Sequence, residues 1–554
     1  MVVAPAFSLA LALSSACGNT ESGSPRKDPA HPEAGDVVAG EAGRCEGCGG
    51  ASVGGGGPTG GVGGVGGSLA GGAGAPTPSG GSGAGSPPAE AGQAGAPTVV
   101  TPAFTLSAVS VLQTLEVPLM SAGLELAPAE RSLPLVAGKS SLFRASFVLS
   151  AAFASRPLLG VLDLQTDGQT HSVVSPLTPT LSSQADKLET SFTFPIVAGD
   201  LTPSSSYRVR VLEADTTPLT SFPESGFVDL GAIAMEPLQV VLVPFIANGF
   251  SPITGASQLG ALRERLRELY PLSDVELSLA APVTLGYVVN GDGDGWDDAL
   301  NKIYELRHAA NPASNVFYFG MLAPDESYAQ YCVDGCILGY SNVADPDDVD
   351  SRGSIGVTVF PDGSGEKDAW DTMAHELGHA MGRDHAPCNV ASSDVDRDWP
   401  DDTAHKNGAI AVYGYDFGAS QLLRPRSYRD VMGYCSPVWI SDYTYAGIFE
   451  RLAHIQAKAA LRTLDLAPPE LFRLARVARD GAVSWLGERS RRGVAARRTL
   501  ALLDAEQRQV GNVEAQVARV DHGGAFVWLP ARALRESGAK LVDLRPLGGA
   551  LLAL

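Results

Sequence analysis

Short apolar runs that alternate with polar residues dominate an early part of the chain. They stand at 141–150, 158–166, 190–197 and 207–214, and Pro, Gly, Asp and Ser separate them. A period of two residues is typical of strands with one buried face, and many short strands between turn residues favour a sandwich. We therefore predict a β-sandwich domain over residues 101–236, with no chemical cluster in it.

The pattern then changes to strands that alternate with helices. Apolar runs predict strands and helically spaced apolar residues predict helices, in the order 237–246 (strand), 257–272 (helix), 275–289 (strand), 296–310 (helix), 315–322 (strand) and 353–361 (strand). Such alternation favours an α/β domain with helices packed on a mixed sheet, here over residues 237–465. Residues 466–554 again predict a small β domain, so the expected fold is multidomain.

The beginning of the chain does not fit a packed core. Many of the 64 glycines of this 554-residue protein lie in residues 18–100, where Ala, Ser and Pro fill most other positions, which predicts a disordered tether. Residues 1–17 begin with an apolar run, which small residues and then Cys17 follow, as in an export signal. Two interpretations stay open: Cys17 carries a lipid that anchors the protein to a bacterial envelope, or the protein is simply secreted.

The net charge argues against one class of partner, and the cysteines indicate the compartment in which the protein folds. The formal net charge of -21 argues against a nucleic-acid partner, and we expect the arginine-rich stretch 489–498 to be a solvated face. Among the seven cysteines, Cys332 pairs by position with Cys336 and Cys388 with Cys435, which an oxidising compartment would close as disulfides.

The segment 371–382 lacks proline and predicts a helix that carries metal-binding chemistry. His375 and His379 stand four residues apart and so project from one helical face, where two imidazoles can share Zn²⁺. Glu376 places a carboxylate beside the metal as a general base. Gly382 can take positive φ and end the helix, which lets His385 reach the ion. Three histidines leave one position open, as in a catalytic zinc site.

The motif HExxHxxGxxH resembles that of the metzincin clan of zinc metalloproteases. The clan also has a methionine turn, which Met432 in VMGYC matches, and Tyr434 follows in a Met-x-Tyr arrangement. By resemblance, Met432 forms an apolar floor beneath the zinc, and Tyr434 contacts the metal or the developing oxyanion. The resemblance implies a metzincin-like α/β fold and endopeptidase activity over residues 237–465.

The branch of the clan is not assigned, because Ala386 follows the third histidine. A β-sandwich ahead of such a domain is similar in layout to the StcE-like secreted metalloproteases, which implies a protein or glycoprotein substrate. By the same resemblance, residues 435–445 line a specificity pocket, with Trp439 and Tyr443 as its candidate determinants. Two other functions stay open: an envelope adhesin or carbohydrate-binding protein with an inactive domain, and a zinc hydrolase of a non-peptide bond.

A second metal candidate is the loop 290–298, where Asp292, Asp294 and Asp298 are spaced as in a calcium loop. Asn301 stands where an EF-hand has its bidentate glutamate, so a solvated Gly-Asp turn is the alternative. Five other histidines lack ligand spacing and are expected to be surface or hydrogen-bonded core residues: His171, His308, His405, His454 and His522.

Overall fold

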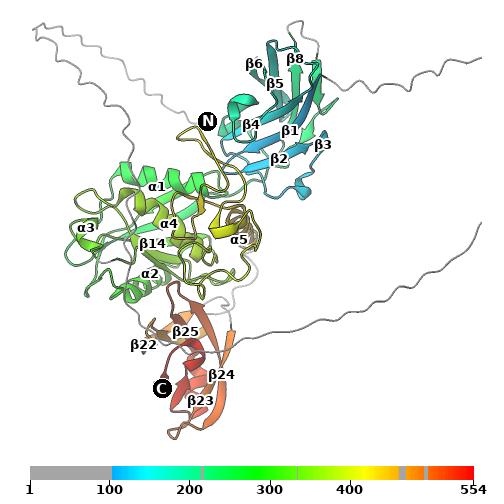
Figure 1. Ribbon diagram of the computed structural model, residues 1–554. Helices are drawn as coiled ribbons and strands as arrows, with labels where there is room; N and C mark the ends of the chain where they lie inside the picture. The colour runs from blue at the N-terminus through cyan, green and yellow to red at the C-terminus, as the bar shows by residue number, and fades with distance from the viewer. Residues whose placement is uncertain (1–102, 214–217, 334, 461–469, 492–496) are drawn as a thin grey trace, which may run out of the picture. The chain divides into compact units, whose positions relative to one another are not determined.

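The computed structural model describes residues 103–213, 218–333, 335–460, 470–491 and 497–554, which all belong to one compact unit, Gly95–Leu554 (Figure 1). The predictions for residues 1–17, for Cys17 and for the tether 18–100 lie outside the described residues. Six helices accompany several sheets in the described residues, so the expectation of a β-rich, multidomain protein is confirmed. Among the described helices, none is long and apolar enough to cross a membrane.

Two antiparallel sheets form the first domain, in the orders β3-β2-β1-β4-β7 and β10-β8-β5-β6, with β9 beside β8. Aromatic side chains fill the space between them; the ring centroids of Phe143 on β4 and Tyr207 on β8, for example, are 5.9 Å apart. The strands are β1 Phe104–Leu112, β2 Glu116–Ser121, β3 Leu124–Glu125, β4 Ser141–Leu149, β5 Leu158–Thr166, β6 Gln169–Leu177, β7 Phe192–Ile196, β8 Ser206–Leu212, β9 Pro218–Phe222 and β10 Val228–Asp229.

The middle domain is a sheet of order β12-β11-β14-β16-β15, with β13 also beside β11. All of its pairs are parallel except β15 with β16, so β15 is an antiparallel edge strand. Its strands and helices are β11 Leu238–Ile246, α1 Ala256–Leu269, β12 Val275–Leu279, β13 Val283–Thr284, α2 Trp296–Ala310, β14 Val316–Leu322, α3 Tyr328–Tyr331, β15 Gly339–Ser341, β16 Gly353–Val357 and α4 Glu366–Ala380.

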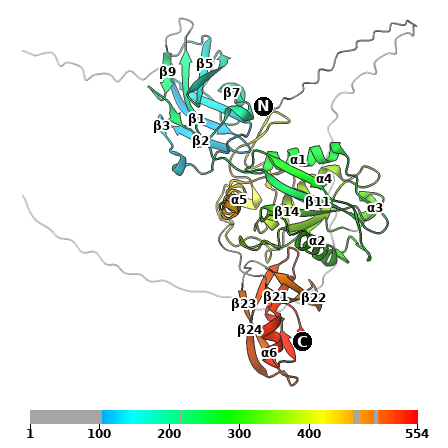
Figure 2. The same cartoon turned by 180° about the vertical axis from the view of Figure 1, so that it is seen from behind.

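Helices cover both faces of this sheet, with α1 and α4 on one side and α2 on the other (Figures 1 and 2). Phe317 and Phe319 of β14 pack with α1 and α4, whereas Leu322 packs with α2. A parallel sheet that is buried on both faces needs apolar residues at successive positions. This explains why its strands are continuous apolar runs in the sequence.

After α4 the chain forms short strand pairs and a long helix, namely β17 Gly414–Asp416, β18 Gln421–Leu423, β19 Arg429–Asp430, β20 Val438–Trp439 and α5 Asp442–Ala460. One predicted strand differs from the structure. The segment 275–289 is broken into β12 and β13, which pair with the same strand β11 at different heights. Pro282 lies in the break, and proline has no N–H to continue a ladder.

The last domain is a seven-stranded sheet of order β22-β21-β25-β24-β23-β26-β27, against which α6 packs (Figure 2). Its elements are β21 Glu470–Val477, β22 Val483–Arg491, β23 Arg497–Leu503, β24 Gln509–Arg519, β25 Ala525–Pro530, α6 Ala531–Ser537, β26 Leu541–Asp543 and β27 Leu551–Ala553. Its apolar face meets the middle domain, where the rings of Phe526 and Tyr304 are 5.9 Å apart.

Buried and partly buried arginines reinforce that contact. Arg491 forms an ion pair with Asp348, and both side chains are 1% exposed. Arg489 pairs with Glu305 at 2.6 Å. The expectation that this arginine-rich stretch is a solvated face is therefore wrong for these two residues, because acidic groups of the middle domain neutralise them.

Arg491→Leu is expected to weaken the fold strongly, because it leaves the Asp348 carboxylate buried without its cation. Breaking a buried pair in this way costs about 3–5 kcal/mol of unfolding free energy. Arg508→Leu is the matched control, since Arg508 is 74% exposed in its pair with Asp504, and a change within about 0.5 kcal/mol is expected there. Urea unfolding of both variants measures the difference, and equal losses would contradict the prediction.

Candidate metal centre

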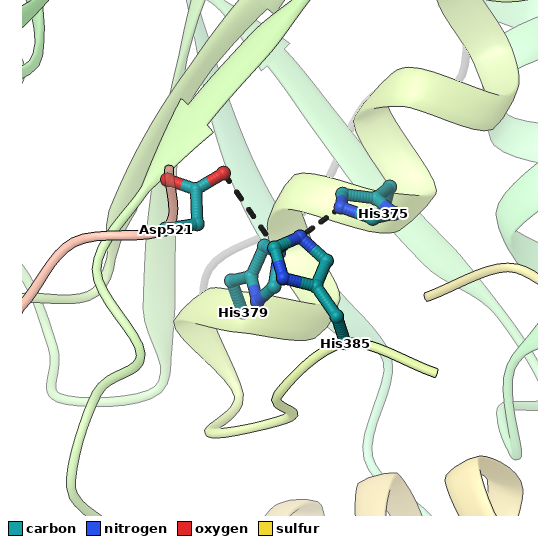
Figure 3. A group of neighbouring side chains, drawn as sticks. All are labelled: His375, His379, His385 and Asp521. Carbon is teal, nitrogen blue, oxygen red and sulfur yellow. Dashed lines mark hydrogen bonds and ion pairs between the residues drawn. The ribbon is translucent and has the colours of Figure 1, made fainter. Parts of the chain in front are cut away.

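Helix α4 and the turn after it bring three predicted ligands together. His375 and His379 lie one turn apart on α4, and His385 returns from the following loop (Figure 3). The helix ends at Ala380, and Gly382 has a φ of +81°. A Cβ on Gly382 would also lie 2.9 Å from the carbonyl oxygen of Ala344 and would collide with Arg451. Only glycine fits this turn, as the sequence predicted.

The three imidazoles converge through their Nε2 atoms. Nε2 of His379 is 3.0 Å from Nε2 of His375 and 3.2 Å from that of His385. Nδ1 of His375 donates to the carbonyl oxygen of Val431 at 2.7 Å, and Nδ1 of His379 donates to that of Arg383 at 2.6 Å. With the proton on Nδ1, Nε2 of His375 and Nε2 of His379 each carry a lone pair that points at the neighbouring ring.

Burial keeps these imidazoles neutral. It lowers the pKa of His375 to about 3 and that of His379 well below its usual value, and it also lowers the pKa of His385. Neutral lone pairs this close repel unless a cation lies between them. Two ligands at about 2.0–2.1 Å from a tetrahedral ion are roughly 3.3 Å apart, close to the separations observed. The donor geometry therefore fits a metal ion.

Two buried carboxylates lie on the elements that carry the group, and one of them, Asp521, belongs to it. Glu376 is 2% exposed, and its Oε1 lies against Gly339 of β15, where any Cβ would collide with it. Oδ2 of Asp521 is 3.8 Å from Nε2 of His379. Neither Oε2 of Glu376 nor Oδ2 of Asp521 accepts a hydrogen bond from a described residue. Burial, together with the Asp521 carboxylate, raises the pKa of Glu376 well above its usual value.

The cluster of His375, His379, His385 and Asp521 is the one group in the described part of the chain in which three or more such ligand atoms lie within 4.8 Å of one another. A cation in its centre would neutralise the Asp521 carboxylate and accept lone pairs from the imidazoles. The expectation of a metal ion is confirmed to this extent: the residues present can hold one.

The loop that carries Met432 lies directly beneath α4. Met432 is fully buried, and a Cβ on Gly378 of α4 would collide with its sulfur. The backbone N–H of Ala386 donates to the Met432 carbonyl oxygen at 3.0 Å. Asp430 holds the turn by accepting from the N–H groups of Met432 and Ser441, both at 2.7 Å. Asp430 was not among the site residues predicted from the sequence.

Tyr434 and a disulfide connect the same two loops. The hydroxyl of Tyr434 is 2.8 Å from Nε2 of His385, so the predicted tyrosine does reach the cluster. Cys388 and Cys435 form a disulfide beside it, and Cys332 and Cys336 form a second one. Both predicted pairings are confirmed, and they are typical of a protein exported to an oxidising compartment.

The two residues predicted for a specificity pocket have different surroundings. Trp439 is 2% exposed, and its indole N–H donates to the carbonyl oxygen of Thr114 in the first domain at 3.1 Å. The hydroxyl of Tyr443 donates to Asp396 at 2.9 Å, and its ring lies under the guanidinium of Arg383. The structure therefore does not place Trp439 in a substrate pocket, since its large apolar ring contributes to the contact between two domains.

The predicted calcium loop is a tight turn before α2. Gly293 and Gly295 have φ values of +111° and +79°, and the N–H of Asp294 donates to Asp292 at 3.3 Å. Asp298 instead faces Arg476 of the last domain at 3.5 Å. The three carboxylates are not brought together as a ligand group, which agrees with the alternative of a Gly-Asp turn.

Two residues at the cluster were missed by the sequence analysis, Asp521 and His522. Both lie in the turn between β24 and β25. His522 was expected to be an ordinary histidine, yet its ring stacks on Tyr434 with centroids 5.9 Å apart. Neither residue has a spacing that relates it to the motif helix, so no local signal in the sequence indicates this contact.

A cavity of about 1110 Å³ opens beside the cluster. His379 and His385 line it from the middle domain, whereas Asp521 and His522 line it from the last domain. The candidate centre thus has access to a space that is large enough for a segment of polypeptide.

No protein-family model matches this chain, and no curated protein does. Solved structures that are similar include a calcium-binding mutant of Bacteroides uniformis beta-glucuronidase 2, with 11% sequence identity and a TM-score of 0.13. That match covers 39% of this chain and 28% of the other. A likeness this low carries no argument about fold or function.

The double variant Cys388→Ser, Cys435→Ser is expected to lose stability, because its disulfide closes a loop between the segments that carry His385 and Tyr434. Removal of a native disulfide typically costs about 2–5 kcal/mol. It should also weaken metal binding, which thermal unfolding with and without added zinc measures. Cys332→Ser, Cys336→Ser is the control, since that bridge joins neither of the segments that carry His385 and Tyr434, and an equal loss of metal binding in both would contradict a bracing role.

Proposed function

We propose that this protein is a zinc-dependent endopeptidase of the metzincin type that acts on protein or glycoprotein substrates outside the cell. The observation that carries the proposal is the convergence of three neutral imidazoles, through Nε2 atoms 3.0 and 3.2 Å apart, with the buried carboxylate of Glu376 on the helix that carries two of them. Three nitrogen ligands with a neighbouring carboxylate are the donor set of a catalytic zinc. The two disulfides support an exported location.

A zinc ion held by His375, His379 and His385 would lower the pKa of water and polarise the scissile carbonyl. The residues of the chain supply the rest. Glu376 follows the first ligand on α4 and is therefore placed to take a proton from the attacking water and return it to the leaving amine. The hydroxyl of Tyr434, beside His385, is placed to donate to the oxyanion that develops on the substrate.

The loops around the ligands support a catalytic rather than a purely structural role. The Nδ1 atoms of His375 and His379 both face backbone carbonyl oxygens, which fixes the orientation of each ring. The methionine turn at Met432 packs under Gly378 between the two ligands. A rigid ligand set next to a cavity of about 1110 Å³ is what hydrolysis of a bulky substrate requires.

Glu376→Gln tests the proposal with zinc-loaded, full-length protein and a peptide library. We expect cleavage by the unchanged protein, its loss on chelation, and a fall of about 10²–10⁴-fold in the variant, the range for loss of a general base. Zinc content should remain equal, because Glu376 is not a ligand. Glu366→Gln is the control: this exposed residue starts the same helix and should leave the rate unchanged.

Cleavage that persists in Glu376→Gln would contradict the assignment of the base. If non-peptide esters are hydrolysed but no peptide is, the centre belongs to a different hydrolase. If the zinc-loaded protein binds glycans and hydrolyses nothing, an adhesin is the better description.

A further inference from the structure

The turn between β24 and β25 reaches from the last domain into the candidate metal centre. The side chain of Asp521, at the tip of this turn, has no exposed surface. Its Oδ1 accepts from the N–H of Ser341 at 2.7 Å, and its own N–H donates to the Ser341 carbonyl oxygen at 3.0 Å. These two bonds fix the carboxylate so that Oδ2 points toward His379, 3.8 Å away (Figure 3).

The same segment covers the edge of the middle sheet. Val520 forms an antiparallel bridge with Asn342, and the N–H of Val343 donates to the carbonyl oxygen of Arg519 at 3.0 Å. Residues 519–521 thus continue the sheet beyond β15, the strand against which Glu376 lies. An exposed edge next to a catalytic base is where an extended peptide would add as a strand.

His522 fills the space on the other side of the tip. Its ring lies parallel to that of Tyr340, with an interplanar angle of 4° and centroids 6.2 Å apart, and it also stacks on Tyr434. Nδ1 of His522 is 3.4 Å from the Tyr434 hydroxyl. The turn therefore contacts the ligand cluster, the edge strand and the tyrosine at the same time.

Charge explains how Asp521 and Glu376 can be buried together. Two carboxylates without cations would repel each other in such a site. Neither second oxygen accepts a hydrogen bond from a described residue, and Oδ2 of Asp521 lies 3.5 Å from Nε2 of His522. A divalent ion bound by three neutral imidazoles carries two positive charges, which these two carboxylates balance. The pair of acids is thus complementary to a divalent metal.

We propose that Asp521 is the fourth ligand of the metal and that its turn takes the place of an extended peptide. The first part depends only on the metal centre, whereas the second rests on the proposed peptidase function. A substrate needs the coordination position that Asp521 fills and the strand edge that residues 519–521 cover, so turn and substrate exclude one another. The described conformation is the latent one, and the last domain controls access.

Cobalt substitution tests the ligand directly, without reference to activity. In full-length protein loaded with Co²⁺, we expect Asp521→Asn to change the visible absorption of the bound ion, because its ligand set changes. Competition with a chelator should show metal affinity weakened by about tenfold or more. Asparagine can still accept from Ser341, so the turn is expected to keep its fold. Glu536→Gln, an exposed carboxylate of the same domain, is the control and should change neither. An unchanged spectrum and affinity in Asp521→Asn overturn the proposal.

Peptide cleavage by the zinc-loaded variants tests the latent state. Asp521→Asn is expected to cleave a peptide library about 5- to 150-fold faster than the unchanged protein, the usual range of coupling between two competing sites. Glu536→Gln should match the unchanged protein. Slower cleavage in Asp521→Asn overturns the latent state. A changed cobalt spectrum with no cleavage by any variant supports the ligand and instead contradicts the peptidase function.

Discussion

The crowding of three imidazole lone pairs is the constraint on which the rest of the site depends. Nε2 of His375 and Nε2 of His379, 3.0 Å apart, cannot donate to each other, because the Nδ1 protons of both rings are held by the carbonyl oxygens of Val431 and Arg383. Nε2 of His385 lies 3.2 Å from that of His379. A cation between the rings would relieve the repulsion of their lone pairs. It can do so only if all three rings keep the orientation that directs their nitrogen atoms at it. The turn at Gly382 is needed for that geometry, since it returns the chain toward the helix.

The need to keep the three rings oriented explains why the loops under and beside α4 are held by several connections. Buried Asp430 holds the Met432 turn, and the disulfide from Cys388 to Cys435 joins the segment after His385 to the segment that carries Tyr434. The Ala386 N–H and the Met432 carbonyl oxygen add a bond between these segments. Each connection removes a way in which a ring could turn away from the others, so local stability and metal affinity depend on the same residues.

The sequence predicts those parts of the site whose geometry is local. The spacing of His375 and His379 places them on one helical face, and Gly382 is required by a positive φ, so both follow from short-range rules. Trp439 and Asp521 do not, because their surroundings are set by domains that meet in space. Trp439 is buried against Thr114, 325 residues away in the chain, and Asp521 reaches His379 from a turn of ordinary composition. No periodicity in the chain encodes such contacts.

Two different motions could uncover the centre, and their costs differ. Undocking the last domain would expose the apolar side chains of Phe526 and Trp528 to water. It would also break the buried ion pair between Arg491 and Asp348, and both changes cost free energy. Withdrawing the tip alone breaks the two bonds to Ser341 and the bond to Val343, each worth about 0.5–1.5 kcal/mol. It also breaks the His522 stacking and the proposed coordination by Asp521, but undocking the whole domain would break all of these contacts as well. Gly523 and Gly524 follow the tip with φ values of +93° and +105°. Withdrawal of the turn therefore costs less free energy than undocking of the last domain. A peptide strand that pairs with the edge of the sheet at β15 would also replace the backbone hydrogen bonds that the turn loses.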